Sequence, residues 1–171
     1  MMTIRTMLIM LLAGCIGCAN AMQPDSNYTL YLVRHAEKQT DQGKDPDLTE
    51  AGRIRSEKLA NWLQDKNIGK IWSTDYKRTR NTALPLVTRL GLGLTIYDPR
   101  DLQALSNEVL LEQTNAVIVG HSNTTPELTR LLCQCEINDM DESEYDLLFV
   151  VSKTKNETTV ETLKQASLLT D

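Results

Sequence analysis

The chain has 171 residues, a length that suits one domain with a substantial core. Hydrophobic residues make up 41% of the chain and charged residues 24%, which is ordinary for a globular protein. The formal net charge of −5 argues against general nucleic-acid binding, so we expect no nucleic-acid partner.

The first stretch, MMTIRTMLIMLLAGCIGCANA, has the pattern of a secretory signal. Arg5 precedes an apolar run over 7–12 that is too short to span a bilayer, and small residues follow. The letters LAGC resemble the bacterial lipoprotein lipobox, which implies that residues 1–14 are a signal peptide and that the thiol of Cys15 is acylated. The alternative is cleavage after Ala21, which would give a soluble secreted protein.

Residues 15–27 are small and polar and are typical of a tether, which leaves 28–171 as the folded domain. We therefore expect an exported protein that reaches the membrane through an N-terminal lipid anchor. Ile16, rather than Asp, follows Cys15. By resemblance to lipoproteins of two-membrane bacteria, this favours an outer-membrane lipoprotein or one that faces the periplasm.

The first half of the expected domain alternates strands with helices. A β-rich run over 28–33 suits a strand buried on both faces, and KIWST over 70–74 suits a second strand. Between them, apolar residues at helical spacing predict a helix over 51–66 that begins near Thr49. A second helix follows KIWST, and Pro85 should kink it or begin a new helical segment.

The second half continues this alternation and closes with a pair of strands joined through KTKNE. Its expected elements are strands over 94–98 and 116–120, helices over 102–113 and from Pro126 to Cys133, and closing strands over 145–152 and 158–165. Strands that alternate with helices predict an α/β fold. We expect a three-layer sandwich with a mostly parallel central sheet flanked by helices.

Polar residues follow three of the predicted strands, at the point where each strand ends. Arg34 and His35 follow the first strand, residues 73–78 follow the second, and His121 follows AVIVG. Ligands of such folds bind beyond the carboxyl ends of the strands, so these clusters should meet at one edge of the sheet.

These residue types suit an oxyanion, and phosphate in particular. The forked donors of Arg34 and Arg78 match phosphate oxygens, and the helix after HSNTT would aim free N–H groups at the same place. A histidine can attack phosphorus, and surrounding positive charge stabilises the transferring group. With two arginines to neutralise the charge, the reaction would need no metal or other cofactor.

Several segments of the sequence resemble the motifs of a known family. LVRHAEK, STDYKRTRNTA and VIVGHSNT are similar to the three signature segments of the histidine phosphatase superfamily, also called phosphoglycerate-mutase-like. LTEAGRIRSEKLANWL is similar to the first helix of that family, and the match runs from about Tyr28 to Leu132. The length is similar to that of short bacterial members, including phosphohistidine phosphatases that act on signalling proteins.

The resemblance implies a role for each matched residue. His35 would be the nucleophile that takes the phosphoryl group, and water would then remove it. Arg34 and Arg78 would bind the phosphate, and His121 would stabilise the transferred group. Asn123 would contact the substrate, cap the following helix, or do both. The implied substrate is a phosphomonoester or phosphoamidate, carried by a phosphorylated small molecule or by a phosphoprotein.

The sequence departs from the family pattern in two respects. Many members have Ser-Pro-Leu where this chain has Thr74, Asp75 and Tyr76. The general acid that would protonate an alkoxide leaving group is not evident, and the candidates are Asp101 and Glu37. The missing acid favours a phosphoamidate or aryl phosphate, which needs the proton less.

Two alternatives to a phosphatase stay open. One is a phosphate-ligand-binding module of the same fold without turnover. The other is a zinc hydrolase, because HAE and CQC resemble parts of a deaminase signature, although the cysteine spacing is wrong for it. In an oxidising compartment, Cys133 and Cys135 would either pair or stay free.

Substrate choice in this family resides in loops, which here correspond to residues 39–48, 97–108 and 134–144. The last of these loops is strongly acidic. We interpret it as a solvated surface loop. The alternative is that it rims the pocket, where it would repel highly anionic substrates.

Overall fold

A computed structural model of the chain describes residues 27–168. The predicted signal peptide over 1–14, the acylation of Cys15, the alternative cleavage after Ala21 and almost all of the 15–27 tether lie outside the described residues. Within 27–168, no helix combines the length and the apolar character that crossing a membrane requires.

Six strands form a single central sheet in the order β3-β2-β4-β1-β5-β6. The first four strands in this order run parallel, β5 is antiparallel to β1, and β6 is antiparallel to β5. The predicted mostly parallel sheet is therefore confirmed. The strands are β1 (Tyr28–Arg34), β2 (Lys70–Thr74), β3 (Leu94–Tyr97), β4 (Ala116–Gly120), β5 (Leu147–Lys153) and β6 (Thr158–Lys164).

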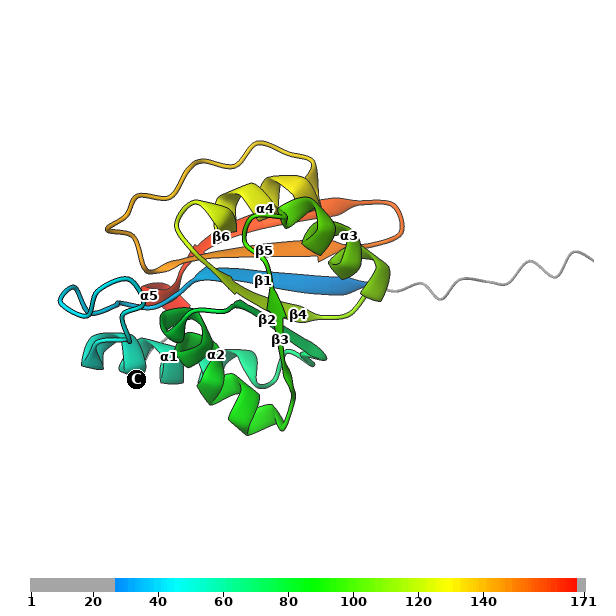
Figure 1. Cartoon of the computed structure of the whole chain (residues 1–171). Helices are drawn as coiled ribbons and strands as arrows, with labels where there is room; N and C mark the ends of the chain where they lie inside the picture. Colours follow the sequence, from blue (N-terminus) through cyan, green and yellow to red (C-terminus); the bar gives the residue numbers. More distant parts are fainter. Residues whose placement is uncertain (1–26, 169–171) are drawn as a thin grey trace, which may run out of the picture.

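Helices cover both faces of the sheet and complete the three layers (Figure 1). Side chains alternate across a strand, so β1 feeds two cores. Leu30 and Leu32 enter the core under α3 and α4, whereas Tyr31 and Val33 enter the core under α1 and α2. The helices are α1 (Glu50–Leu63), α2 (Lys77–Leu90), α3 (Leu102–Glu112), α4 (Thr124–Cys133) and the short α5 (Gln165–Leu168).

Local signals explain where the helices begin. The hydroxyl of Thr49 accepts a hydrogen bond from the backbone N–H of Gly52 and caps α1. Of the two outcomes expected at Pro85, the start of a new helical segment is wrong, because α2 runs through Pro85 as one helix, and the kink stays a prediction. A proline inside a helix costs about 3 kcal/mol, and the packing of the buried Ala83 and Leu86 on the same helix offsets this cost.

Candidate active site

The register of two central strands brings both histidines together. Arg34 at the end of β1 is paired with Gly120 at the end of β4. The next residue on each strand is a histidine, and the ring centres of His35 and His121 are 5.5 Å apart. A side chain at Gly120 would clash, since its Cβ would lie 2.9 Å from the hydroxyls of Thr124, Thr125 and Tyr97. The predicted convergence at this edge of the sheet is present.

The environment of His35 fixes its tautomer. Its Nδ1 lies 2.8 Å from the carbonyl oxygen of Ala36, which can only accept, so Nδ1 carries the proton and Nε2 keeps a free lone pair. Burial, and then the charges of Arg34, His121 and Arg78, lowers the pKa of His35 to about 3. The ring is therefore neutral at neutral pH, as a nucleophile must be.

His121 is held by a chain of hydroxyl groups that the sequence did not reveal. Its Nε2 lies 3.0 Å from the hydroxyl oxygen of Thr74, whose own hydroxyl donates to that of Thr79. Thr79 in turn donates to backbone carbonyls. Because the hydroxyl proton of Thr74 is used on Thr79, Thr74 accepts from His121, and Nε2 of His121 carries the proton. Burial and the charges of Arg78 and Arg34 lower the pKa of His121 to about 4.

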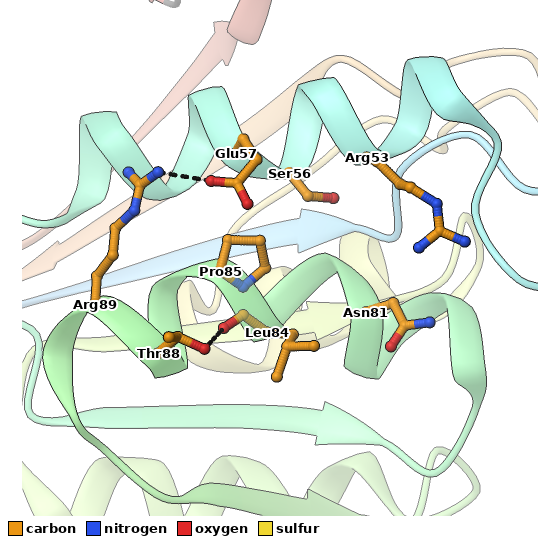
Figure 2. A pocket seen from close by; sticks show the side chains of 8 residues that line it. All are labelled: Arg53, Ser56, Glu57, Asn81, Leu84, Pro85, Thr88 and Arg89. Carbon is orange, nitrogen blue, oxygen red and sulfur yellow. Dashed lines mark hydrogen bonds and ion pairs between the residues drawn. The ribbon is translucent and has the colours of Figure 1, made fainter.

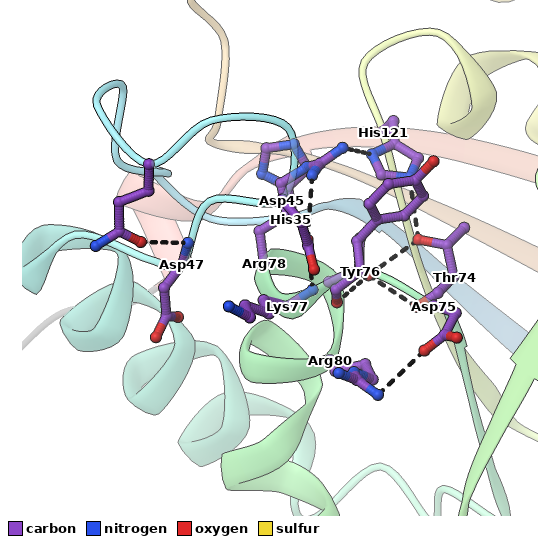
Figure 3. Close-up of polar contacts among 12 residues, drawn as sticks. His35, Asp45, Asp47, Thr74, Asp75, Tyr76, Lys77, Arg78, Arg80 and His121 are labelled. Carbon is purple, nitrogen blue, oxygen red and sulfur yellow. Dashed lines mark hydrogen bonds and ion pairs between the residues drawn. The ribbon is translucent and has the colours of Figure 1, made fainter.

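The guanidinium group of Arg78 lies against His121 with much of its bonding capacity unused (Figure 3). One terminal nitrogen is 3.5 Å from Nδ1 of His121, and the other is 3.7 Å from a carboxylate oxygen of Asp45. The group also lies 4.4 Å from the ring centre of Tyr76. Its Nε and Nη1 are buried without a hydrogen-bond partner. Buried unpaired donors are costly, so an acceptor that reached this corner would complete the hydrogen bonding of Arg78.

Arg34 is almost entirely buried, and most of its donors hold a loop. Nη1 donates to the backbone carbonyls of Asp141, Glu142 and Glu144 at 2.7–3.2 Å, and Nη2 donates to the Glu142 carboxylate at 2.9 Å. Tyr145 stacks on the guanidinium, with its ring centre 4.1 Å from Cζ. Only Nε of Arg34 is buried without a partner.

The interpretation of residues 134–144 as a purely solvated surface loop is therefore wrong. Besides its bond to Arg34, the Glu142 carboxylate accepts a hydrogen bond from Ser122, next to His121. The bond from Ser122 and, against the effect of burial, the charge of Arg34 lower the pKa of Glu142. This loop lies against the site because its backbone carbonyls accept hydrogen bonds from the buried Arg34. The two segments are about a hundred residues apart, so no local sequence pattern predicts the contact.

The two carboxylates predicted as general acids are engaged elsewhere. Glu37 accepts three hydrogen bonds from Arg55, and this pairing outweighs burial and lowers the pKa of Glu37. Asp101 caps α3 by accepting from the backbone N–H of Ala104 at 3.0 Å. The carboxylates that pair with the two arginines of the site are Glu142 and Asp45.

Asn123 is exposed and lines a cavity beside His121, where a contact with the substrate was one of the two roles expected for it. Its side chain makes no capping hydrogen bond to α4, so the capping role is not seen. The cavity measures about 300 Å³ and is lined by Tyr76, Arg78, Pro99, Arg100, His121, Asn123 and Thr124.

A separate cavity of about 350 Å³ lies between α1 and α2 (Figure 2). The half-exposed Leu84 and the ion pair between Arg89 and Glu57 line it. It contains neither histidine and neither of the two arginines of the site, so it is not part of the reaction centre.

The zinc alternative loses its ligands, because Cys133 and Cys135 form a disulfide. Over residues 27–168, no group of three or more His, Cys, Asp or Glu side chains is arranged to hold a metal ion.

Comparisons with known proteins agree with this geometry. Residues 30–103 match the model of the histidine phosphatase superfamily, branch 1. No curated protein sequence matches the chain.

Solved structures of about 15–17% identity share the fold over about four fifths of this chain. The protein histidine phosphatase SixA, in complex with tungstate, has a TM-score of 0.66 at 17% identity, with 82% of this chain and 99% of that chain covered. A mycobacterial glucosyl-3-phosphoglycerate phosphatase has a TM-score of 0.64 at 15% identity (81% and 99% covered). The alpha-ribazole phosphatase from Shigella flexneri has a TM-score of 0.62 at 17% identity (80% and 96% covered).

Proposed function

Because residues 30–103 match the model of the histidine phosphatase superfamily, we propose that the protein is a phosphatase that works through a phosphohistidine intermediate on His35. One observation carries the proposal. Nδ1 of His35 is held by the carbonyl of Ala36, which leaves Nε2 free, and the neighbouring Arg34 and Arg78 keep buried donors without a hydrogen-bond partner.

In the first step, Nε2 of His35 attacks the phosphorus atom and an N–P bond forms. The bond from phosphorus to the leaving group breaks, and the leaving group departs with the electron pair. Nε and Nη1 of Arg78 and Nε of Arg34 would donate to the phosphoryl oxygens, which supplies the acceptors they lack. Two guanidinium charges can carry out this neutralisation without a metal.

In the second step, water attacks the phosphohistidine, the N–P bond breaks, and His35 returns to its neutral form. His121 faces the transferred group through Nδ1, since its Nε2 is bound to Thr74. An arriving phosphate dianion would favour the imidazolium form of His121, which could then donate from Nδ1 to a phosphoryl oxygen.

The test is the release of inorganic phosphate from an aryl phosphate in the presence of excess chelator. We expect turnover by the wild-type chain and loss of at least about a thousandfold in His35→Ala, in line with the removal of a nucleophile. Arg80→Met is the matched control, because Arg80 lies on the same helix as Arg78 but is half exposed and paired with Asp75. Turnover that His35→Ala retains would contradict the proposal.

A phosphate-binding module without turnover is the second candidate, and the positions of Glu37 and Asp101 favour it. With both carboxylates engaged elsewhere, an alkoxide leaving group has no evident proton donor. Phosphate that binds tightly while no substrate is hydrolysed above the His35→Ala background would favour this candidate.

The substrate class stays open between a phosphorylated small molecule and a phosphoprotein. SixA is a protein histidine phosphatase, whereas the mycobacterial and Shigella relatives act on small phosphorylated compounds by their names. A phosphoamidate or an aryl phosphate fits this site better than an alkyl phosphate, because its leaving group depends less on a proton donor.

We further propose that the protein is exported and anchored by a lipid on Cys15, so that the catalytic domain works beside a membrane. The LAGC motif at the end of the apolar run supports this placement. Metabolic labelling with a fatty acid should mark the wild-type chain, and Cys15→Ala should abolish the label and release the protein from the membrane fraction. An unlabelled wild-type chain would favour cleavage after Ala21.

A further inference from the structure

A second cavity adjoins the one beside His121. It measures about 450 Å³ and lies beyond the end of β3. Tyr76, Pro99 and Arg100 line both cavities, so the two meet at this wall. The remaining residues that line the second cavity are Asp75, Ile96, Tyr97 and Asp98. A group attached to a phosphoryl group between Arg78 and His121 would therefore find the second cavity on the other side of this wall.

The wall of this hollow has apolar side chains, and its charged residues are ion-paired, Asp75 with Arg80 and Asp98 with Arg100. Ile96 is 46% exposed, one of few large hydrophobic side chains in residues 27–168 that are left open to water. Pro99 and the ring of Tyr76 continue the apolar surface. The guanidinium of Arg100 is exposed, but Asp98 accepts from its Nε and Nη2 at 2.7–3.1 Å and neutralises the charge. Such a surface complements an uncharged, planar group.

Tyr76 is fixed by the groups that would hold the phosphoryl oxygens. One face of its ring carries the guanidinium of Arg78 at 4.4 Å, and the ring meets His121 edge-on with centres 5.1 Å apart. The position of the ring relative to the reaction centre is therefore set before any ligand arrives. A preorganised aromatic wall gains most from an aromatic partner at stacking distance.

We propose that Tyr76, Pro99 and Ile96 form a subsite for the aromatic leaving group of an aryl phosphate. This inference rests on the proposed function, which it deepens by naming the substrate class. A second observation agrees with it. When His35 attacks, the P–O bond to a phenol breaks and phenolate leaves with the electron pair. Because phenols have a pKa near 10, phenolate can leave without a proton donor. Such a substrate therefore suits a site in which Glu37 and Asp101 are engaged elsewhere.

Two inert phosphonates test the subsite without relying on turnover. Phenylphosphonate and methylphosphonate share the head group and differ in the ring, so the ratio of their dissociation constants reports the subsite alone. We expect the wild-type chain to bind phenylphosphonate about tenfold more tightly, as for an added aromatic contact. Calorimetry should show that the ratio of the two dissociation constants falls toward one in Tyr76→Ala and by a factor of about three in Ile96→Ser. The ratio should be unchanged in Tyr76→Phe.

Leu84→Ala is the control, since Leu84 is similarly exposed but lines the cavity between α1 and α2. It should leave the ratio unchanged. Loss of affinity for both phosphonates by the same factor in Tyr76→Ala, with no change of ratio in Ile96→Ser, would overturn the subsite. A wild-type ratio near one would do the same.

The outcome separates the two proposals. If the chain prefers phenylphosphonate but hydrolyses no aryl phosphate, the subsite is supported and the proposed phosphatase activity is refuted. Turnover of phenyl phosphate by a chain without the preference would keep the phosphatase and remove the subsite. If neither phosphonate binds, the phosphoryl site itself is refuted, and the subsite with it.

Discussion

Arg78 should destabilise the empty protein, because its side chain is mostly buried with two donors unpaired. The side chain is 14% exposed, and Nε and Nη1 have no hydrogen-bond partner. Each buried unpaired donor costs about 1–3 kcal/mol. Against this stand the contact with the Tyr76 ring, worth about 0.5–2 kcal/mol, and a partly exposed ion pair with Asp45, worth about 0.2–1 kcal/mol.

We therefore expect Arg78→Met to raise the free energy of unfolding by roughly 1–3 kcal/mol in phosphate-free buffer. Methionine has a similar length and leaves no donor unpaired. The order should reverse in phosphate, because Arg78→Met loses two of the three unpaired donors that would bind the anion. At a concentration of about 100 times the dissociation constant, binding adds about 2.7 kcal/mol to the stability of the wild-type chain.

Urea unfolding with and without phosphate measures both effects. Arg80→Met is the matched control and should change the stability by less than about 0.5 kcal/mol, since that side chain is 47% exposed. An Arg78→Met variant that is less stable than the wild-type chain without phosphate would refute the reasoning. So would equal stabilisation of both chains by phosphate.

Three more predictions concern the same site. In the folded state the pKa values of His35 and His121 are about 3 and 4, whereas in the unfolded chain histidine takes up a proton near pH 6.5. The free energy of unfolding should therefore fall as the pH drops from about 6.5 to 4. Urea unfolding midpoints at pH 7 and pH 5 check this. Glu142→Gln should tighten phosphate inhibition about 2–5-fold, because a mostly exposed carboxylate no longer competes for Arg34, whereas Glu136→Gln on the same loop should not. Weaker phosphate inhibition in Glu142→Gln would show that the loop is needed to form the site. Thr74→Val removes the hydroxyl that accepts from Nε2 of His121. We expect kcat to fall about tenfold with little change in KM. An unchanged kcat would mean that the chain of hydroxyl groups has no role in turnover.

The sequence predicted those parts of the site that depend on strand ends. His35 and His121 follow buried strands, and a parallel sheet brings such positions to one edge, so their meeting followed from hydrophobic pattern alone. The same holds for Arg78, which opens the helix after the neighbouring strand.

What could not be predicted depends on contacts between distant loops. Glu142 reaches Arg34 because the 134–144 loop folds back over the sheet edge, and nothing in its acidic composition distinguishes that from a solvated loop. For the general acid, residue type alone was misleading. Glu37 and Asp101 stand near the right places in the chain, but Arg55 and the start of α3 take their carboxylates. A helix cap and an ion pair become visible only when the partners are in place.

The most direct measurement is the detection of phosphate covalently bound to His35. The wild-type chain should be mixed with phenyl phosphate, quenched in alkali, which preserves the N–P bond, and digested for mass spectrometry. The account predicts one phosphoryl group on the peptide that contains His35, and none on that peptide in His35→Ala. Steady turnover with no phosphorylated peptide, or with the phosphoryl group on His121, would contradict it.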